Sequence, residues 1–102
     1  MFSRRADALL SSAERFDLIS VLAGTPFAGG LVPDPGGIRK VRFAGGGRGK
    51  RGGFRVIYYV SGTDMPVLAL LIYGKNEQVN PTAEQRRAMA AVVAGLNATI
   101  RQ

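Results

Sequence analysis

Residues 36–60, GGIRKVRFAGGGRGKRGGFRVIYYV, contain two strand-like runs joined by a glycine-rich connection. In the first run, residues 38–44, the period of two that is typical of a strand places Ile38, Lys40 and Arg42 on one side and Arg39, Val41 and Phe43 on the other. The second run, residues 54–61, is rich in β-branched and aromatic side chains, which favour strands. Because the connection between them is short, we expect the two strands to pair antiparallel.

The segment before this stretch predicts two helices. Residues 3–23 carry an apolar stripe with helical spacing. Ser11 and Glu14 have the spacing of a capping box, which predicts a short first helix to about Leu10 and a second helix beginning beyond it. The second helix is expected to end before Gly24, which suits a left-handed cap. The expected stripe consists of Leu9, Ala13, Phe16 and Ser20, widened by Leu18, Ile19 and Leu22.

Three further segments complete the expected fold. Residues 24–37 hold five glycines and three prolines and are predicted to be loop. Residues 67–73, VLALLIY, are almost uniformly apolar, which is typical of a strand at the centre of a sheet. Thr82 and Gln85 have capping-box spacing ahead of a final helix. Its apolar stripe consists of Met89, Val92, Val93, Leu96 and Ile100.

This order of elements predicts an α+β fold in a single domain, residues 1–102. We expect two N-terminal helices, an antiparallel sheet of three or four strands and a C-terminal helix. The helices are expected to pack on one face of the sheet.

The composition limits the chemistry that the chain offers. The 102 residues carry a formal net charge of +7, which favours an anionic partner such as nucleic acid. The chain has no cysteine and no histidine, so thiolate metal sites and the usual neutral-pH general base are excluded, and we expect no metal and no cofactor. No apolar run is long enough for a membrane span or a secretory signal, so the cytoplasm is the expected compartment.

Half of the fourteen basic residues fall in one short region that contains no carboxylate. A solvated, aggregation-resistant sheet face would explain some charge, but such faces tend to mix signs. A single-signed cluster beside a glycine-rich loop is more typical of a surface that follows a nucleic-acid backbone. The loop does not match a Walker motif. The seven basic residues are Arg39, Lys40, Arg42, Arg48, Lys50, Arg51 and Arg55.

Two further features bear on function. Tyr58 and Tyr59 are adjacent on one strand and must point to opposite sides, which favours one in the core and the other available to stack on a base. Taken singly, each tyrosine is more often packed in a core. Residues 73–77, YGKNE, follow the most apolar strand directly and place polar groups at the edge of a sheet, where sites are often built.

From Gly36 to about Met89 the chain resembles the RelE/HigB family of toxins from type II toxin–antitoxin systems, in particular the HigB-like branch. The resemblance rests on residues 36–60, the apolar strand, the sequence IYGKNEQ and the capped helix. It implies a RelE-like fold and an mRNA interferase, a metal-independent endoribonuclease that cuts mRNA on the ribosome and inhibits translation. It also implies a helix-turn-helix, HigA-like antitoxin as partner, with operator DNA bound only by the toxin–antitoxin complex.

The resemblance also implies a set of site residues. The catalytic positions fall on Lys40, Arg42, Arg55 and Lys75, and RNA-binding positions on Arg39, Arg48, Lys50, Arg51 and Asn76. The chain departs from the family pattern in two places, after the last strand and before the first helix. No tyrosine follows the last strand, so either Tyr73 substitutes or no tyrosine takes part. The family's strand before the first helix is also missing, so either the true start lies upstream of Met1 or the protein lacks one edge strand.

Two other functions agree with parts of the same pattern. A ParE-like toxin of the same fold would poison DNA gyrase without cutting RNA. A non-enzymatic nucleic-acid-binding module would explain the charge and the glycines but gives no role to YGKNE.

Overall fold

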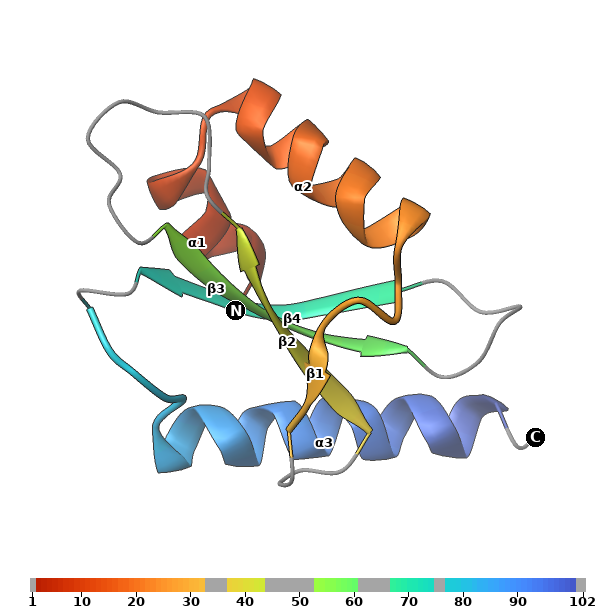
Figure 1. The fold of residues 1–102 in the computed structure, drawn as a ribbon. Helices are drawn as coiled ribbons and strands as arrows, with labels where there is room; N and C mark the ends of the chain where they lie inside the picture. Colours follow the sequence, from red (N-terminus) through yellow and green to blue (C-terminus); the bar gives the residue numbers. More distant parts are fainter. Residues whose placement is uncertain (1, 33–36, 44–52, 61–66, 75–76, 101–102) are drawn as a thin grey trace.

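The computed structural model describes residues 2–32, 37–43, 53–60, 67–74 and 77–100, without the side chains of the last two. Its elements follow the predicted order, and the α+β class is confirmed (Figure 1). One antiparallel sheet has the strand order β1-β2-β3-β4. In chain order the elements are α1 (Phe2–Leu9), α2 (Ser12–Gly24), β1 (Gly30–Leu31), β2 (Ile38–Phe43), β3 (Phe54–Val60), β4 (Val67–Gly74) and α3 (Ala83–Ile100).

Helices cover both faces of the sheet, so the expectation that all helices pack on one face is wrong. Helices α1 and α2 lie on one side and α3 lies on the other (Figure 1). Alternate residues of β3 therefore enter two separate cores. The first core, under α1 and α2, contains Ala6, Leu10, Leu18, Leu22, Phe54, Val56, Tyr58 and Ile72. The second core, under α3, contains Ile38, Ile57, Tyr59, Leu70, Leu71, Tyr73, Met89 and Val93.

Strand β4 is an edge strand, which corrects its predicted place at the sheet centre. It is apolar because both of its faces are covered: Ile72 enters the first core, and Leu71 and Tyr73 enter the second. The pairing of β3 with β4 is irregular between Ile57 and Tyr58 and skips Leu70, which also packs in the second core. Burial on two faces, rather than a central position, explains the uniform run of apolar residues.

A short strand, β1, lies within the segment that was predicted to be loop throughout. Gly30 pairs with Lys40 at the edge of the sheet beside β2. The preceding glycine is needed because a Cβ atom on Gly29 would lie 2.7 Å from the Tyr58 hydroxyl and 2.8 Å from the Lys40 carbonyl oxygen. The Gly29 amide also donates a hydrogen bond of 2.9 Å to that hydroxyl. This close approach is what attaches β1 to the rest of the sheet.

The start of α2 is confirmed, its predicted end is wrong, and only part of its predicted apolar stripe is buried. The Ser11 side chain accepts a hydrogen bond from the Glu14 amide, and the Glu14 carboxylate accepts one from the Ser11 amide. Gly24 belongs to the helix, and Thr25 is the C-cap. Leu18 and Leu22 of the expected stripe are buried, as is Glu14 four residues before Leu18, whereas Phe16 and Ile19 of that stripe are exposed.

At the start of α3 the predicted capping box is also present. The Thr82 amide donates to the Gln85 side chain (2.9 Å), and the Gln85 amide donates to the Thr82 hydroxyl (3.1 Å). Met89 and Val93 of the expected stripe are buried, whereas Val92 is exposed. Helix α3 thus packs on the second core through a narrower stripe than the sequence predicts, because Val92 is not part of it.

Candidate functional site

Three of the predicted catalytic residues, Lys40, Arg42 and Arg55, form what we call the basic cluster. Lys40 and Arg42 alternate with side chains of the first core, so they share one side of β2, as predicted, and this side faces α3. Arg55 lies between Phe54 and Val56 of the first core and so shares that side. Strand register places Arg42 directly opposite Arg55. The sheet thus brings three cations together from two neighbouring strands.

The cluster remains accessible from one side. Arg42 is exposed, and Lys40 and Arg55 are half-buried. Among the described residues, the ion pairs join Arg5 to Glu77 and Arg15 to Asp7, and neither includes Lys40 or Arg42. Like charges directly opposite each other on a sheet are destabilising. An anion bound over Arg42 and Arg55 would relieve that repulsion.

Tyr73 continues the row of side chains on β4, opposite Arg55. Its ring is fully buried, and its hydroxyl donates a hydrogen bond of 3.1 Å to the Val79 carbonyl. Burial raises the pKa of Tyr73 because it disfavours the phenolate, and the nearby Arg55 charge offsets part of that rise. Tyr73 is therefore a neutral, packed neighbour of Arg55 whose hydroxyl is already engaged.

Arg39, a predicted RNA-binding residue, lies on the opposite side of β2 from the basic cluster. Its guanidinium donates to the Gly29 carbonyl (2.7 Å) and, at a longer distance, to the Phe27 carbonyl (3.4 Å). It also lies over the Phe27 ring, 5.1 Å from the ring centroid. These contacts attach the segment before β1 to the sheet, which is a structural use of its charge.

The other predicted site residues lie outside the described part of the chain. They are the three basic residues of the glycine-rich loop and the two residues that follow β4: Arg48, Lys50, Arg51, Lys75 and Asn76.

Both tyrosines in the middle of β3 are buried, so the expectation that one is available to stack on a base is wrong. Tyr58 is fully buried in the first core, where its hydroxyl accepts the Gly29 amide. Tyr59 lies in the second core, and its hydroxyl donates to the Asn97 side-chain oxygen at 3.0 Å. Helices on both faces of the sheet account for this outcome, because both sides of β3 are covered at Tyr58 and Tyr59.

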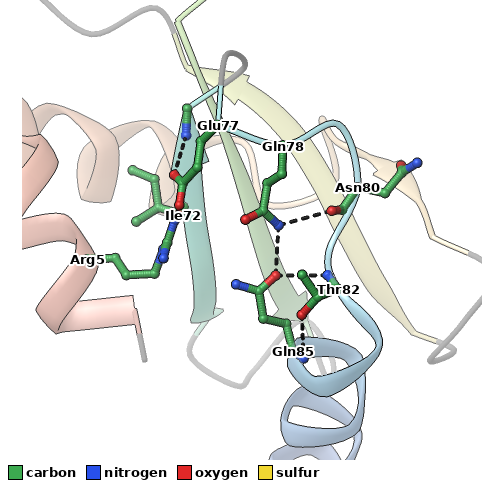
Figure 2. A network of polar contacts seen from close by, with 8 residues as sticks. Arg5, Ile72, Glu77, Gln78, Asn80, Thr82 and Gln85 are labelled. Atoms are coloured by element: carbon green, nitrogen blue, oxygen red, sulfur yellow. Dashed lines mark hydrogen bonds and ion pairs between the residues drawn. The ribbon is translucent and has the colours of Figure 1, made fainter.

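The edge of the sheet beside the cluster is held by a contact that sequence reasoning missed. Arg5 of α1 donates from Nε to the Ile72 carbonyl at 2.7 Å and pairs through its guanidinium with Glu77 (Figure 2). The other Glu77 oxygen accepts the Gly74 amide at 3.3 Å. Arg5 stands 72 positions before Glu77, so no local pattern could have indicated the pair.

The connection from Glu77 to α3 is ordered by a chain of side-chain amides. The Gln78 side chain donates to the Asn80 carbonyl at 3.0 Å and to the Gln85 side-chain oxygen at 2.7 Å (Figure 2). That oxygen also accepts the Thr82 amide of the capping box. The turn after β4 and the start of α3 are thus one hydrogen-bonded unit.

Glu77, at the start of this unit, is ionised at neutral pH. The hydrogen bond from Arg5 lowers the pKa of Glu77, against the smaller opposing effect of partial burial, and the Gly74 amide lowers it further. In the described part of the chain, no three acidic side chains gather in a group that could hold a metal ion.

A comparison with protein-family models finds none that matches the chain. Within the described residues, no helix has both the length and the apolar character needed to cross a bilayer.

Proposed function

We propose that this chain is the toxin of a type II toxin–antitoxin pair, of the HigB-like branch, and that it cuts ribosome-bound mRNA. The observation that carries the proposal is the pairing of Arg42 with Arg55 on the face that also holds Lys40. A sheet gains nothing from two arginines opposite each other. A phosphodiester backbone would neutralise both, and the resemblance of residues 36–89 to the RelE/HigB family supplies the chemistry.

The proposed reaction is attack of a ribose 2′-oxygen on the adjacent phosphorus, with cleavage of the bond to the 5′-oxygen. The 2′-hydroxyl gives its proton to a base, and the leaving 5′-oxygen receives a proton from an acid. The products are a 2′,3′-cyclic phosphate and a 5′-hydroxyl. Because the chain has no histidine, lysine and arginine must stabilise most of the developing charge.

The residues then divide into three roles. Arg55 holds the scissile phosphate, because its planar guanidinium matches two phosphate oxygens. Lys40 or Lys75 serves as base or acid. Arg42 and Lys50 bind the flanking phosphates, together with the other cations of the glycine-rich loop.

The proposed setting is the bacterial cytoplasm. The partners are the ribosome with its mRNA and a helix-turn-helix antitoxin that neutralises the toxin. Operator DNA is bound only by the toxin–antitoxin complex.

The deciding experiment adds the purified chain to an in vitro translation reaction and maps mRNA breaks by primer extension. We expect codon-spaced breaks with the wild type and a loss of about 10²–10³ in rate for Arg55→Ala. Arg55→Lys should recover only part of the activity, because an ammonium cannot make a two-point contact. Arg4→Ala is the matched control: it removes the same charge from an exposed position on α1, across the sheet from the cluster.

Each outcome favours one function. Wild-type cleavage that survives Arg55→Ala would overturn the site assignment. Intact mRNA together with stalled DNA gyrase would point to a ParE-like toxin. Salt-dependent RNA binding without cleavage, even with ribosomes present, would point to a binding module. Normal bacterial growth during verified soluble expression, without antitoxin, would contradict every toxin assignment.

A further inference from the structure

Strand β4 has an unpaired edge because it is the last strand of the sheet. The Ile72 carbonyl and the Gly74 amide at the end of this strand are bonded by side chains. Arg5 donates to the Ile72 carbonyl, and Glu77 accepts from the Gly74 amide. Arg5 and Glu77 also pair with each other, which closes a ring of contacts around the strand edge (Figure 2). The two side chains thus make the hydrogen bonds that a further strand would make.

The contacts among Arg5, Glu77 and the edge of β4 connect parts of the fold that are otherwise separated by the sheet. Arg5 belongs to α1 on one face, and Glu77 begins the segment that leads to α3 on the other. Tyr73 is the residue between the two bonded backbone groups. It points toward the second core, stands opposite Arg55, and bonds Val79 through its hydroxyl.

We propose that Arg5 is a positioning residue for the basic cluster. By holding the backbone on both sides of Tyr73, the pair of Arg5 and Glu77 fixes the place of the Tyr73 side chain, which stands opposite Arg55 in the strand register, and through it the direction of the Arg55 guanidinium. The catalytic consequence rests on the proposed function, whereas the placement of Tyr73 does not. Arg5 itself contacts Ile72 and Glu77 and needs no contact with RNA.

A positioning role and a purely structural role predict different kinetics. If Arg5 only stabilises the fold, Arg5→Gln should lower the melting temperature and leave kcat unchanged at temperatures where the variant is fully folded. If Arg5 positions the cluster, kcat should fall by about tenfold with KM within about twofold of wild type, because small displacements at a reacting centre reduce rate strongly. KM is expected to change little because the charges that bind the RNA backbone are all retained.

The variants distinguish the hydrogen bonds that Arg5 and Glu77 make with β4 from the ion pair between the two side chains. Glu77→Gln keeps an acceptor for the Gly74 amide but removes the ion pair. The double variant of Arg5→Gln and Glu77→Gln should have a kcat no lower than that of the poorer single variant, because both changes break the same set of contacts. Arg5→Lys should recover part of kcat, since one ammonium cannot reproduce both contacts of the guanidinium. The matched control is Arg15→Gln, which breaks the ion pair with Asp7 between α1 and α2; Arg15 also donates a hydrogen bond to Ser3, which belongs to α1 as well.

A second measurement tests the inference without any assay of cleavage. In aromatic NMR spectra, Arg5→Gln should shift the Tyr73 ring signals, while those of Tyr59, which bonds Asn97 in the same core, should stay in place. Tyr73 signals that do not move overturn the inference, as does an unchanged kcat in a folded Arg5→Gln variant. If the wild type does not cut mRNA, the proposed function fails, and the Tyr73 signals still decide whether Arg5 positions the cluster.

Discussion

The attachment of β1 to the sheet depends on the absence of a side chain at Gly29, and Gly29→Ala tests this directly. The added Cβ would lie 2.7 Å from the Tyr58 hydroxyl, 2.8 Å from the Lys40 carbonyl oxygen and 3.0 Å from the Lys40 carbonyl carbon. Two of these three atoms belong to the backbone of β2, so a side-chain rotation cannot remove the clash. Either β1 moves away from β2, or the hydrogen bond from the Gly29 amide to Tyr58 is lost.

The expected cost follows from these two effects. Overpacking of a buried position costs about 1–3 kcal/mol. A buried donor or acceptor left without its partner costs about 1–3 kcal/mol. We expect a loss of at least about 2 kcal/mol in the free energy of unfolding. For a domain of this size that corresponds to a melting temperature lower by about 8–16 °C.

The neighbouring glycine is a matched control. A Cβ on Gly30 meets nothing within 4 Å. Gly30→Ala should therefore be neutral or slightly stabilising, by up to about 1 kcal/mol, because alanine reduces the entropy of the unfolded chain. Both variants are measured by thermal and urea unfolding followed by circular dichroism. Equal melting temperatures for the two variants would refute the close approach of β1 to β2.

Three other predictions follow from single contacts. Arg55→Ala should leave the fold intact, because it removes the repulsion across the strand pair with Arg42; loss of a cooperative unfolding transition would contradict this prediction. Ser11→Ala should cost about 1 kcal/mol in urea unfolding through loss of the α2 cap, and an unchanged unfolding midpoint would count against the capping box. The pKa of Glu77 is lowered in the folded state, so its pair with Arg5 stabilises the fold at pH values above the ordinary glutamate pKa. This contribution is lost as the pH falls through the lowered pKa. Because Glu77 is partly exposed, the effect should be below about 1 kcal/mol. Between about pH 6 and pH 3, the free energy of unfolding of Glu77→Gln should depend less on pH than that of wild type. Identical pH profiles would contradict the prediction.

Local patterns in the sequence were sufficient for every element except β1 and for part of the site. The period of two in β2 placed Lys40 and Arg42 on one side, because successive side chains of a strand must alternate. Both capping boxes formed as predicted, since they require only residues three positions apart.

The face that α2 buries could not be predicted from its apolar residues, because such residues lie on two sides of the helix. Glu14 is turned inward by the capping box, and Leu18 and Leu22 follow it at intervals of one helical turn. Phe16 and Ile19 are then left on the outside. The orientation of α2 about its own axis is therefore set by its first turn, where the capping box turns Glu14 inward, and by the packing of the leucines that follow on the same side.

What the sequence alone determined about this protein is the order of its helices and strands and the gathering of cations on one hairpin, because both follow from residues that are close in the chain. Only the tertiary structure decided that helices cover both faces, that β4 is an edge strand and that Tyr58 and Tyr59 are both buried. It alone placed Arg5 against Ile72 and Glu77, which are 67 and 72 positions away. Such contacts depend on how the layers pack, and layer packing is set by the summed burial of many side chains rather than by any local pattern.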